Sequence, residues 1–213
     1  SDAITREIEN GANAAASRGN VPRIPMEAAL KQGKIEHLDP DPAYFEQISK
    51  LIDLESLRNT GYTIIVDPMY GAGAGYMKRF LEGGSTRLIE INTERNPVFP
   101  DMERPEPIAV NLNKLSRTML EHGAHVGLAT DGDADRMGVM DENGNFLTQL
   151  QVFALLCLYL LEVRRESGAI VKTITTTSMV YRLGELFNVP VHEEMVGFKN
   201  VAPVMIEHDA LIG

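Results

Sequence analysis

The chain contains the stretch His125-Val-Gly-Leu-Ala-Thr-Asp-Gly-Asp-Ala-Asp-Arg-Met-Gly-Val-Met140, in which two apolar runs enclose a loop crowded with carboxylates. Asp131, Asp133 and Asp135 alternate with a glycine and an alanine, so an extended or looped backbone turns the three side chains toward one side. Three like charges this close repel each other unless a cation lies among them. Hard oxygen ligands suit Mg²⁺, Ca²⁺ or Mn²⁺ rather than zinc. The stretch therefore predicts a divalent-cation site on a tight loop.

The short loop also limits the direction of the strands around it. A parallel crossover needs about a dozen residues or more, so the two apolar runs should form an antiparallel pair. Upstream, apolar β-branched runs alternate with helical patterns, which indicates parallel strands joined through helices. We predict a three-layer α/β/α domain with a mixed, mainly parallel four-stranded sheet whose last strand is antiparallel. The expected strands are 62–66, 86–91, 125–129 and 137–141, and the expected helices are 43–57, 76–81 and 112–122.

The same alternation of helices and strands returns in the C-terminal third of the chain. Helices are expected at 151–165, 178–187 and 200–208, and strands at 169–175 and 189–193. Leu211-Ile212 is the start of a further strand, so this second domain of similar topology is predicted to be truncated. Residues 1–40 have the composition of a tail and linker, with one helix over 2–10 that ends at Gly11. The predicted division is therefore 1–40, 41–150 and 151–213.

Composition narrows the class of protein. The 213 residues carry a formal net charge of −10, which argues against nucleic acid or an anionic membrane as partner. Cys157 is the only cysteine and lies in an apolar helical run, so we expect it to be packed rather than reactive. No signal peptide is visible, and the longest apolar run is far short of the ~20 residues of a membrane span, which favours the cytoplasm. The opening Ser1-Asp2 suggests a processed or excised chain.

The carboxylate loop has alternative interpretations. Counting Asp131 as position one of an EF-hand puts Asp133, Asp135 and Glu142 at positions three, five and twelve, as a Ca²⁺-binding module requires. However, Arg136 replaces the glycine of position six, and the flanks are strand-like rather than helical. A solvated turn without a ligand is a second alternative. A metal-assisted phosphoryl-transfer site is the third, and Arg136 suits it because a guanidinium group binds phosphate.

The run Gly71-Ala-Gly-Ala-Gly75 invites a different function, that of an NAD-dependent oxidoreductase. It follows a strand and opens a helix, and Glu90 lies near the end of the next strand. The third glycine of the dinucleotide fingerprint falls on Tyr76, however, and Asp67-Pro-Met-Tyr70 intervenes before the turn. A tight strand-to-helix turn is the simpler interpretation. No Gly-Lys-Ser/Thr follows, so the run is not a P-loop.

Other polar residues give weaker signals. Val196-Gly-Phe-Lys199 opens a helix, where a lysine is placed to meet an anionic ligand. Thr175-Thr-Thr-Ser178 is interpreted as a strand end and helix cap. The histidines have no metal-ligand spacing and are interpreted as structural or exposed; they are His37, His122, His125, His192 and His208.

Taken together, these residues resemble the α-D-phosphohexomutase superfamily, which comprises phosphoglucomutases and phosphomannomutases. Ala129-Thr-Asp-Gly-Asp-Ala-Asp-Arg136 is similar to the family's metal-binding loop. Val66-Asp-Pro-Met-Tyr-Gly71 and the segment around Asn96 and Phe99-Pro100 resemble its second domain. Met195-Val-Gly-Phe-Lys199 resembles the third-domain loop that faces the sugar phosphate. The resemblance covers nearly the whole chain.

The resemblance implies a fragment of a four-domain enzyme: the end of domain one and a linker, then domain two, then part of domain three. It implies interconversion of hexose 1-phosphate and hexose 6-phosphate through a phosphoserine and a bisphosphorylated intermediate. It assigns Mg²⁺ to Asp131, Asp133 and Asp135, phosphoserine positioning to Arg136, and substrate contact to Gly197 and Lys199.

The family's phosphoserine segment, of the type Thr-Ala-Ser-His-Asn, does not occur in the sequence, so no nucleophile is assigned within this chain. The expected partners are hexose phosphate and the remaining domains of the same polypeptide. We therefore expect the isolated chain to be inactive and to bind Mg²⁺ weakly. Whether the sugar is glucose, mannose or glucosamine is left open.

Overall fold

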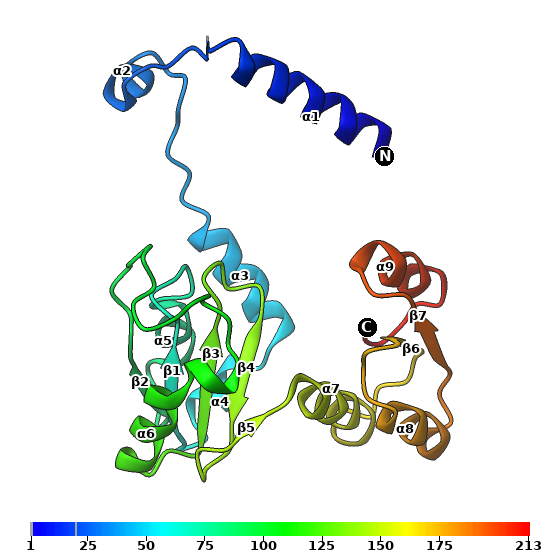
Figure 1. Cartoon of the computed structure of the whole chain (residues 1–213). Helices are drawn as coiled ribbons and strands as arrows, with labels where there is room; N and C mark the ends of the chain where they lie inside the picture. Colours follow the sequence, from blue (N-terminus) through cyan, green and yellow to red (C-terminus); the bar gives the residue numbers. More distant parts are fainter. Residues whose placement is uncertain (1, 20) are drawn as a thin grey trace. The chain divides into compact units, whose positions relative to one another are not determined.

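The computed structural model describes residues 2–19 and 21–213, and the chain divides into two compact units, Ser1–Leu51 and Ile52–Gly213 (Figure 1). The first unit holds α1 (Asp2–Ser17), α2 (Met26–Lys31) and α3 (Asp41–Leu51). The prediction that the first helix ends at Gly11 was wrong, because α1 continues to Ser17. A glycine inside a helix costs only about 1 kcal/mol relative to alanine, and the helix-forming Ala14–Ala16 follow.

The single helix expected over 43–57 is two helices, α3 and α4 (Leu54–Arg58). Asp53 separates them, since its side chain accepts a hydrogen bond from the Ser56 backbone N–H at 3.0 Å and so caps α4. The aspartate is a strong N-cap, and it overrides the apolar periodicity that runs across both segments.

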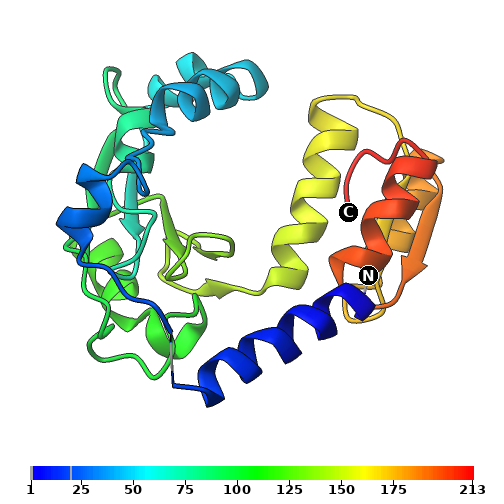
Figure 2. The ribbon, with the colours of Figure 1, turned by 90° about the horizontal axis from the view of Figure 1, so that it is seen from above.

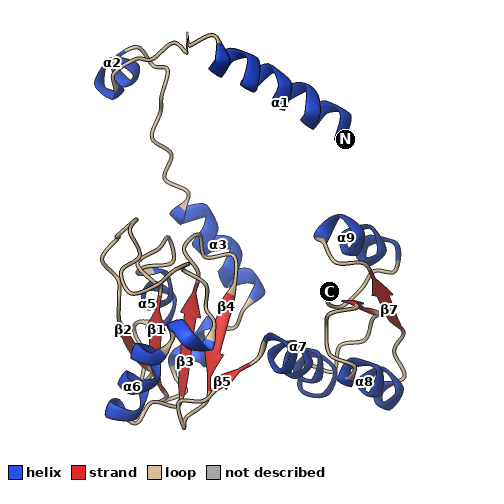
Figure 3. Ribbon diagram, in the orientation of Figure 1, coloured by secondary structure: helices blue, strands red, loops and turns tan. Residues whose placement is uncertain are grey.

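The expected mixed sheet is confirmed, with one more strand than predicted (Figure 3). Its order is β2-β1-β3-β4-β5; β1 pairs in parallel with β2 and β3, while β3–β4 and β4–β5 are antiparallel. The extra strand β5 is two residues long, too short to give a period-two signal in the sequence. The strands are β1 (Thr63–Asp67), β2 (Arg87–Glu90), β3 (Val126–Thr130), β4 (Met137–Met140) and β5 (Phe146–Leu147).

Helices cover the central strand. The helix α6 (Asn113–His122), preceded by the 3₁₀ turn η1 (Ala109–Asn111), packs on β1 and β3. Its Leu115 and Met119 are fully buried against Ile65. The shorter α5 (Tyr76–Leu81) contacts β2 and α4. From Ile64 to Asp67 every residue of β1 is buried, as a central strand with both faces covered requires.

The C-terminal segment begins with α7 (Gln149–Leu158) and the π-helical η2 (Tyr159–Val163). Cys157 is buried there, as predicted, in a core with Ile170 and Val180. A parallel bridge between Ile170 and Ile212 confirms the start of a third strand. Figure 2 shows α9 (Phe198–Glu207) lying against the strands β6 (Ile170–Thr173) and β7 (Val191–Glu194). The remaining elements are β6 (Ile170–Thr173), α8 (Met179–Phe187), β7 (Val191–Glu194) and α9 (Phe198–Glu207), with β6 and β7 parallel. Across the described residues, no helix has the length and apolar character needed to cross a membrane.

Candidate metal centre

The carboxylate loop lies where the sequence predicts it, between two antiparallel strands. The β3–β4 ladder ends at the pair formed by Thr130 and Met137, and residues 131–136 close the turn. Because β1 and β3 run in parallel, the loop extends from the carboxyl end of the parallel part of the sheet. Open α/β sheets bind their ligands at this edge.

The three aspartates gather as the alternating pattern predicts. One carboxylate oxygen from each of Asp131, Asp133 and Asp135 lies within 4.8 Å of the others. Asp131 is fully buried, whereas Asp133 and Asp135 are exposed. Oxygens on opposite sides of one Mg²⁺ lie about 4.2 Å apart, so small side-chain rotations bring all three onto one ion. The donor set and its spacing therefore fit a hard divalent cation.

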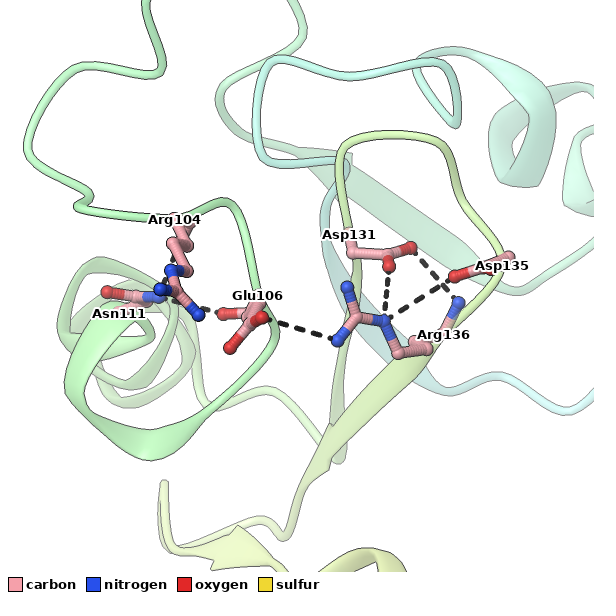
Figure 4. A network of polar contacts seen from close by, with 6 residues as sticks. All are labelled: Arg104, Glu106, Asn111, Asp131, Asp135 and Arg136. Carbon is pink, nitrogen blue, oxygen red and sulfur yellow. Dashed lines mark hydrogen bonds and ion pairs between the residues drawn. The ribbon is translucent and has the colours of Figure 1, made fainter. Parts of the chain in front are cut away.

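Arg136 holds the buried aspartate from two directions (Figure 4). Its backbone N–H donates to Asp131 Oδ1 at 3.0 Å, and its Nε donates to Asp131 Oδ2 at 2.7 Å. The same guanidinium lies 3.5 Å from Asp135 Oδ1 through Nε and 3.5 Å from Glu106 Oε1 through Nη1. Since each carboxylate oxygen has two lone pairs, these contacts leave Asp131 with capacity for a cation.

The pKa values of Asp131 and Asp135 are shifted in opposite directions. Burial raises the pKa of Asp131, but the hydrogen bonds from the Arg136 backbone and side chain outweigh it and hold that pKa below its ordinary value. The pKa of Asp135 is raised, first by a hydrogen bond shared with Asp131 and then by the negative charges of Asp133 and Asp131. The pKa of Arg136 is raised, chiefly by its hydrogen bond to Asp131. Asp131 is therefore an anion at neutral pH, as a metal ligand must be.

A neighbouring segment supports the arginine. Asn111 donates from Nδ2 to the backbone oxygens of Arg104, at 3.0 Å, and Glu106, at 2.9 Å (Figure 4). These bonds hold the backbone from which the Glu106 carboxylate reaches Arg136. No pattern in the sequence predicts this support, because Glu106 lies in an irregular segment some 30 positions before Arg136.

A second polar group at the same edge was also missed. Asp67 ends β1, is fully buried, and accepts hydrogen bonds from the Met69 backbone at 2.8 Å and from Asn92 Nδ2 at 3.0 Å on each oxygen. Lys114 Nζ in turn donates to Asn92 Oδ1 at 2.5 Å. Burial raises the pKa of Asp67, while these hydrogen bonds and the Lys114 charge oppose it. An aspartate directly after a buried strand is a usable signal, but its partners are not.

The predicted substrate residues lie in the C-terminal segment. Gly197 precedes α9 with a φ of +118°, a conformation that favours glycine, and Lys199 is exposed in the first turn of that helix. Phe198 between them is 76% exposed. Their contact with a substrate stays a prediction.

Neither alternative function is supported. The carboxylate loop is flanked by strands β3 and β4, not by the helices of an EF-hand. The glycine turn after β1 packs against backbone: a Cβ placed on Gly71 would lie 2.4 Å from the Gly132 carbonyl oxygen. The glycine turn thus packs against the metal loop in this chain, and no observation places a dinucleotide there.

Two family models match this chain. Residues 42–144 match the phosphoglucomutase/phosphomannomutase α/β/α domain II, and residues 149–213 match α/β/α domain III. The chain belongs to the phosphoglucomutase/phosphomannomutase family.

Individual relatives agree with the family. A probable phosphoglucosamine mutase from Thermococcus kodakarensis is 30% identical over 99% of the chain, which covers 45% of that relative. The crystal structure of a putative phosphomannomutase from Thermus thermophilus is 36% identical, with a TM-score of 0.70 over 77% of this chain and 38% of that one. An Aspergillus fumigatus N-acetylphosphoglucosamine mutase, solved with GlcNAc-6P and magnesium, shares the fold at 15% identity, with a TM-score of 0.56 over 78% of this chain and 37% of that one. The chain thus spans less than half the length of these proteins.

Proposed function

We propose that the chain is the metal-binding and sugar-facing part of a phosphohexomutase, which interconverts hexose 1-phosphate and hexose 6-phosphate through a phosphoserine. The observation that carries this proposal is the group of Asp131, Asp133 and Asp135 at the ligand edge of the sheet, in a chain that matches both family domains. Because the chain spans less than half of its relatives, the activity is proposed for these residues acting with the rest of such an enzyme.

In the proposed reaction, the bond between phosphorus and the serine oxygen breaks while a free hydroxyl of the sugar phosphate bonds to phosphorus, and the hydroxyl proton ends on the serine oxygen. The bisphosphorylated sugar reorients, and its other phosphoryl group returns to the serine. Asp131, Asp133 and Asp135 would hold Mg²⁺ through one oxygen each. When bound, Mg²⁺ supplies the positive charge that stabilises the transferred phosphoryl oxygens.

Arg136 would position the phosphoserine. Its Nε is committed to Asp131 at 2.7 Å, whereas Nη1 has only a 3.5 Å contact with Glu106, and the side chain is 58% exposed. A guanidinium group has five N–H donors in a planar fork, so donors remain for a phosphate beside the metal loop. The arginine would thus link the buried metal ligand to the incoming group.

Gly197 and Lys199 would contact the sugar phosphate. The exposed lysine and the N-terminal end of α9, whose N-cap Gly197 has no side chain to bond the helix end, present positive charge to an anion. Because a related archaeal protein is named a probable phosphoglucosamine mutase, glucosamine phosphate is the first substrate to test, with glucose and mannose phosphates beside it.

Metal titration of the 213-residue chain tests the carboxylate assignment. We expect Mg²⁺ binding by calorimetry, or Mn²⁺ binding by electron paramagnetic resonance, at modest affinity. Asp131→Asn should weaken it on the order of 100-fold, because the buried ligand loses its charge. Binding that is unchanged in Asp131→Asn would contradict the site.

Glu142→Gln is the matched control. Glu142 is exposed on the turn after β4 and would be the twelfth ligand of an EF-hand loop. The three-aspartate site predicts no effect of this change on affinity. Loss of binding in Glu142→Gln, together with a preference for Ca²⁺ over Mg²⁺, would instead favour a Ca²⁺-binding loop.

A further inference from the structure

The glycine turn after β1 lies directly against the metal loop. The Ala72 backbone N–H donates to the Gly132 carbonyl oxygen at 3.0 Å. A Cβ on Gly71 would lie 2.4 Å from that oxygen and 2.8 Å from the Gly132 Cα. These are backbone atoms, so a side chain at position 71 can be accommodated only if the metal loop and the glycine turn move apart.

The next alternate glycine meets the other half of the loop. A Cβ on Gly73 would lie 2.5 Å from Thr130 Oγ1 and 3.5 Å from the Ala134 Cβ. Thr130 Oγ1 is buried and has no hydrogen-bond partner among the described residues, so a side chain at position 73 would press against an enclosed polar atom. Ala134 has a φ of +63°, which costs roughly 1 kcal/mol for a residue with a Cβ, in a turn closed by the bond from the Ala134 backbone N–H to the Asp131 carbonyl oxygen at 3.1 Å.

These glycines are required by space rather than by backbone conformation. Neither Gly71 nor Gly73 has a positive φ, whereas Gly75 in the same run does, at +81°. A glycine with ordinary φ marks a close approach of another group. Here that group is the backbone of the metal loop.

The opposite side of the loop is held as well. The Gly132 backbone N–H donates to the Pro105 carbonyl oxygen at 3.2 Å. A Cβ on Gly132 would lie 3.0 Å from Pro105 Cγ and 3.2 Å from Phe99 Cζ. The Gly132 residue is therefore bonded through its carbonyl to the glycine turn and through its N–H to the segment that carries Glu106.

We propose that the turn Gly71–Gly75 is the support on which the metal loop is positioned, and that Gly71 and Gly73 are positioning residues for the cation. Alternate glycines of the turn meet the alternate small residues of the loop, Gly132 and Ala134. Asp133 lies between these two small residues, and Asp131 and Asp135 flank them, so this packing turns the three carboxylates away from the support and toward one another. The proposal rests on the proposed function, because it assumes that the three aspartates bind a divalent cation.

Measuring the metal affinity of the 213-residue chain and its glycine variants tests the positioning role of the glycine turn. Gly71→Ala should weaken Mg²⁺ binding on the order of tenfold, the cost typical of losing a group that orients metal ligands. Gly75→Ala is the matched control: it lies in the same turn and strains a positive φ, but its Cβ would meet nothing within 4 Å. Gly75→Ala should lower stability and leave the affinity unchanged. Equal metal affinities in the two folded variants would overturn the proposal.

Amide hydrogen exchange supplies a readout that needs no metal. In Gly71→Ala the Ala72 and Gly132 amides should exchange faster than in the parent chain, whereas Gly75→Ala should leave the Gly132 amide protected. Unchanged exchange at both amides in Gly71→Ala would overturn the positioning role. A parent chain that binds no Mg²⁺ or Mn²⁺ would count against the proposed function instead. The exchange data would then test only whether the glycine turn holds the backbone of the metal loop.

Discussion

The three aspartates of the metal loop differ in burial and in their hydrogen-bond partners. Asp131 is fully buried and paired twice with Arg136, while Asp133 and Asp135 are exposed. Burial without Arg136 would favour the neutral acid, so the arginine keeps the inner ligand charged when no cation is bound. The sequence predicts that the carboxylates converge, but it cannot predict which one is buried, because burial depends on the strand end and on the neighbouring turn.

Cys157 gives a prediction at the same scale. Burial raises the pKa of its thiol to about 11. At pH 8 only about one thiol in a thousand is then a thiolate, which is the reactive form. Ellman's reagent should therefore react very slowly with the native chain and promptly in concentrated guanidinium chloride. Rapid native labelling would show that the core around Ile170 opens readily.

The directions of the strands were predictable, because they depend on the lengths of the connections between neighbouring strands. The antiparallel pair of β3 and β4 followed from the shortness of the loop between them, and the parallel strands from their helical crossovers. The continuation of α1 past Gly11 and the break between α3 and α4 at Asp53 were not predicted. A single glycine or a single capping residue changes the free energy of a helix only slightly, so sequence patterns locate helix boundaries poorly. The contact between the glycine turn and the metal loop was missed because it joins residues some 60 positions apart.

The link between β6 and β7 predicts how the C-terminal segment responds to acid. The buried Lys172 pairs with Glu193, whose Oε2 also accepts a hydrogen bond from Tyr181 Oη at 2.7 Å. The Lys172 hydrogen bond, and then that of Tyr181, lowers the pKa of Glu193. A lowered folded-state pKa contributes stability that is present above the unfolded value of 4.5 and is lost as pH falls through the folded value.

Glu193→Gln should thus destabilise the chain at pH 7, because Lys172 is left buried without its counter-ion. It should also flatten the loss of stability below pH 4.5. Urea unfolding followed by circular dichroism from neutral to acid pH measures both effects. The control is Glu185→Gln, an exposed glutamate on the same helix as Tyr181. Parallel pH profiles for the parent and Glu193→Gln would contradict the role given to this pair.

At the scale of the whole molecule, the β-α-β order occurs twice, each time with a candidate site after a strand. The metal loop follows β3, and the short loop that leads to Gly197 and to Lys199 at the start of α9 follows β7. Both sites are therefore at carboxyl ends of parallel strands, where side chains of different segments can serve one ligand. Neither loop contains a serine, so neither supplies the nucleophile that the proposed reaction needs.

This arrangement predicts an inactive chain and an active chimera. The 213 residues supply three carboxylates for Mg²⁺ but no phosphoserine segment, so the purified chain should not interconvert glucosamine, glucose or mannose phosphates in a coupled assay. Residues 42–213 grafted in place of the matching part of the Thermococcus kodakarensis relative should restore turnover, because they supply both matched domain segments. The same chimera with Asp131→Asn should lose on the order of 100-fold in rate. Turnover by the chain alone would refute the expected inactivity. A folded chimera that binds Mg²⁺ yet converts none of the three sugars would refute the mutase assignment, since every residue proposed for metal and substrate would then be present without the reaction.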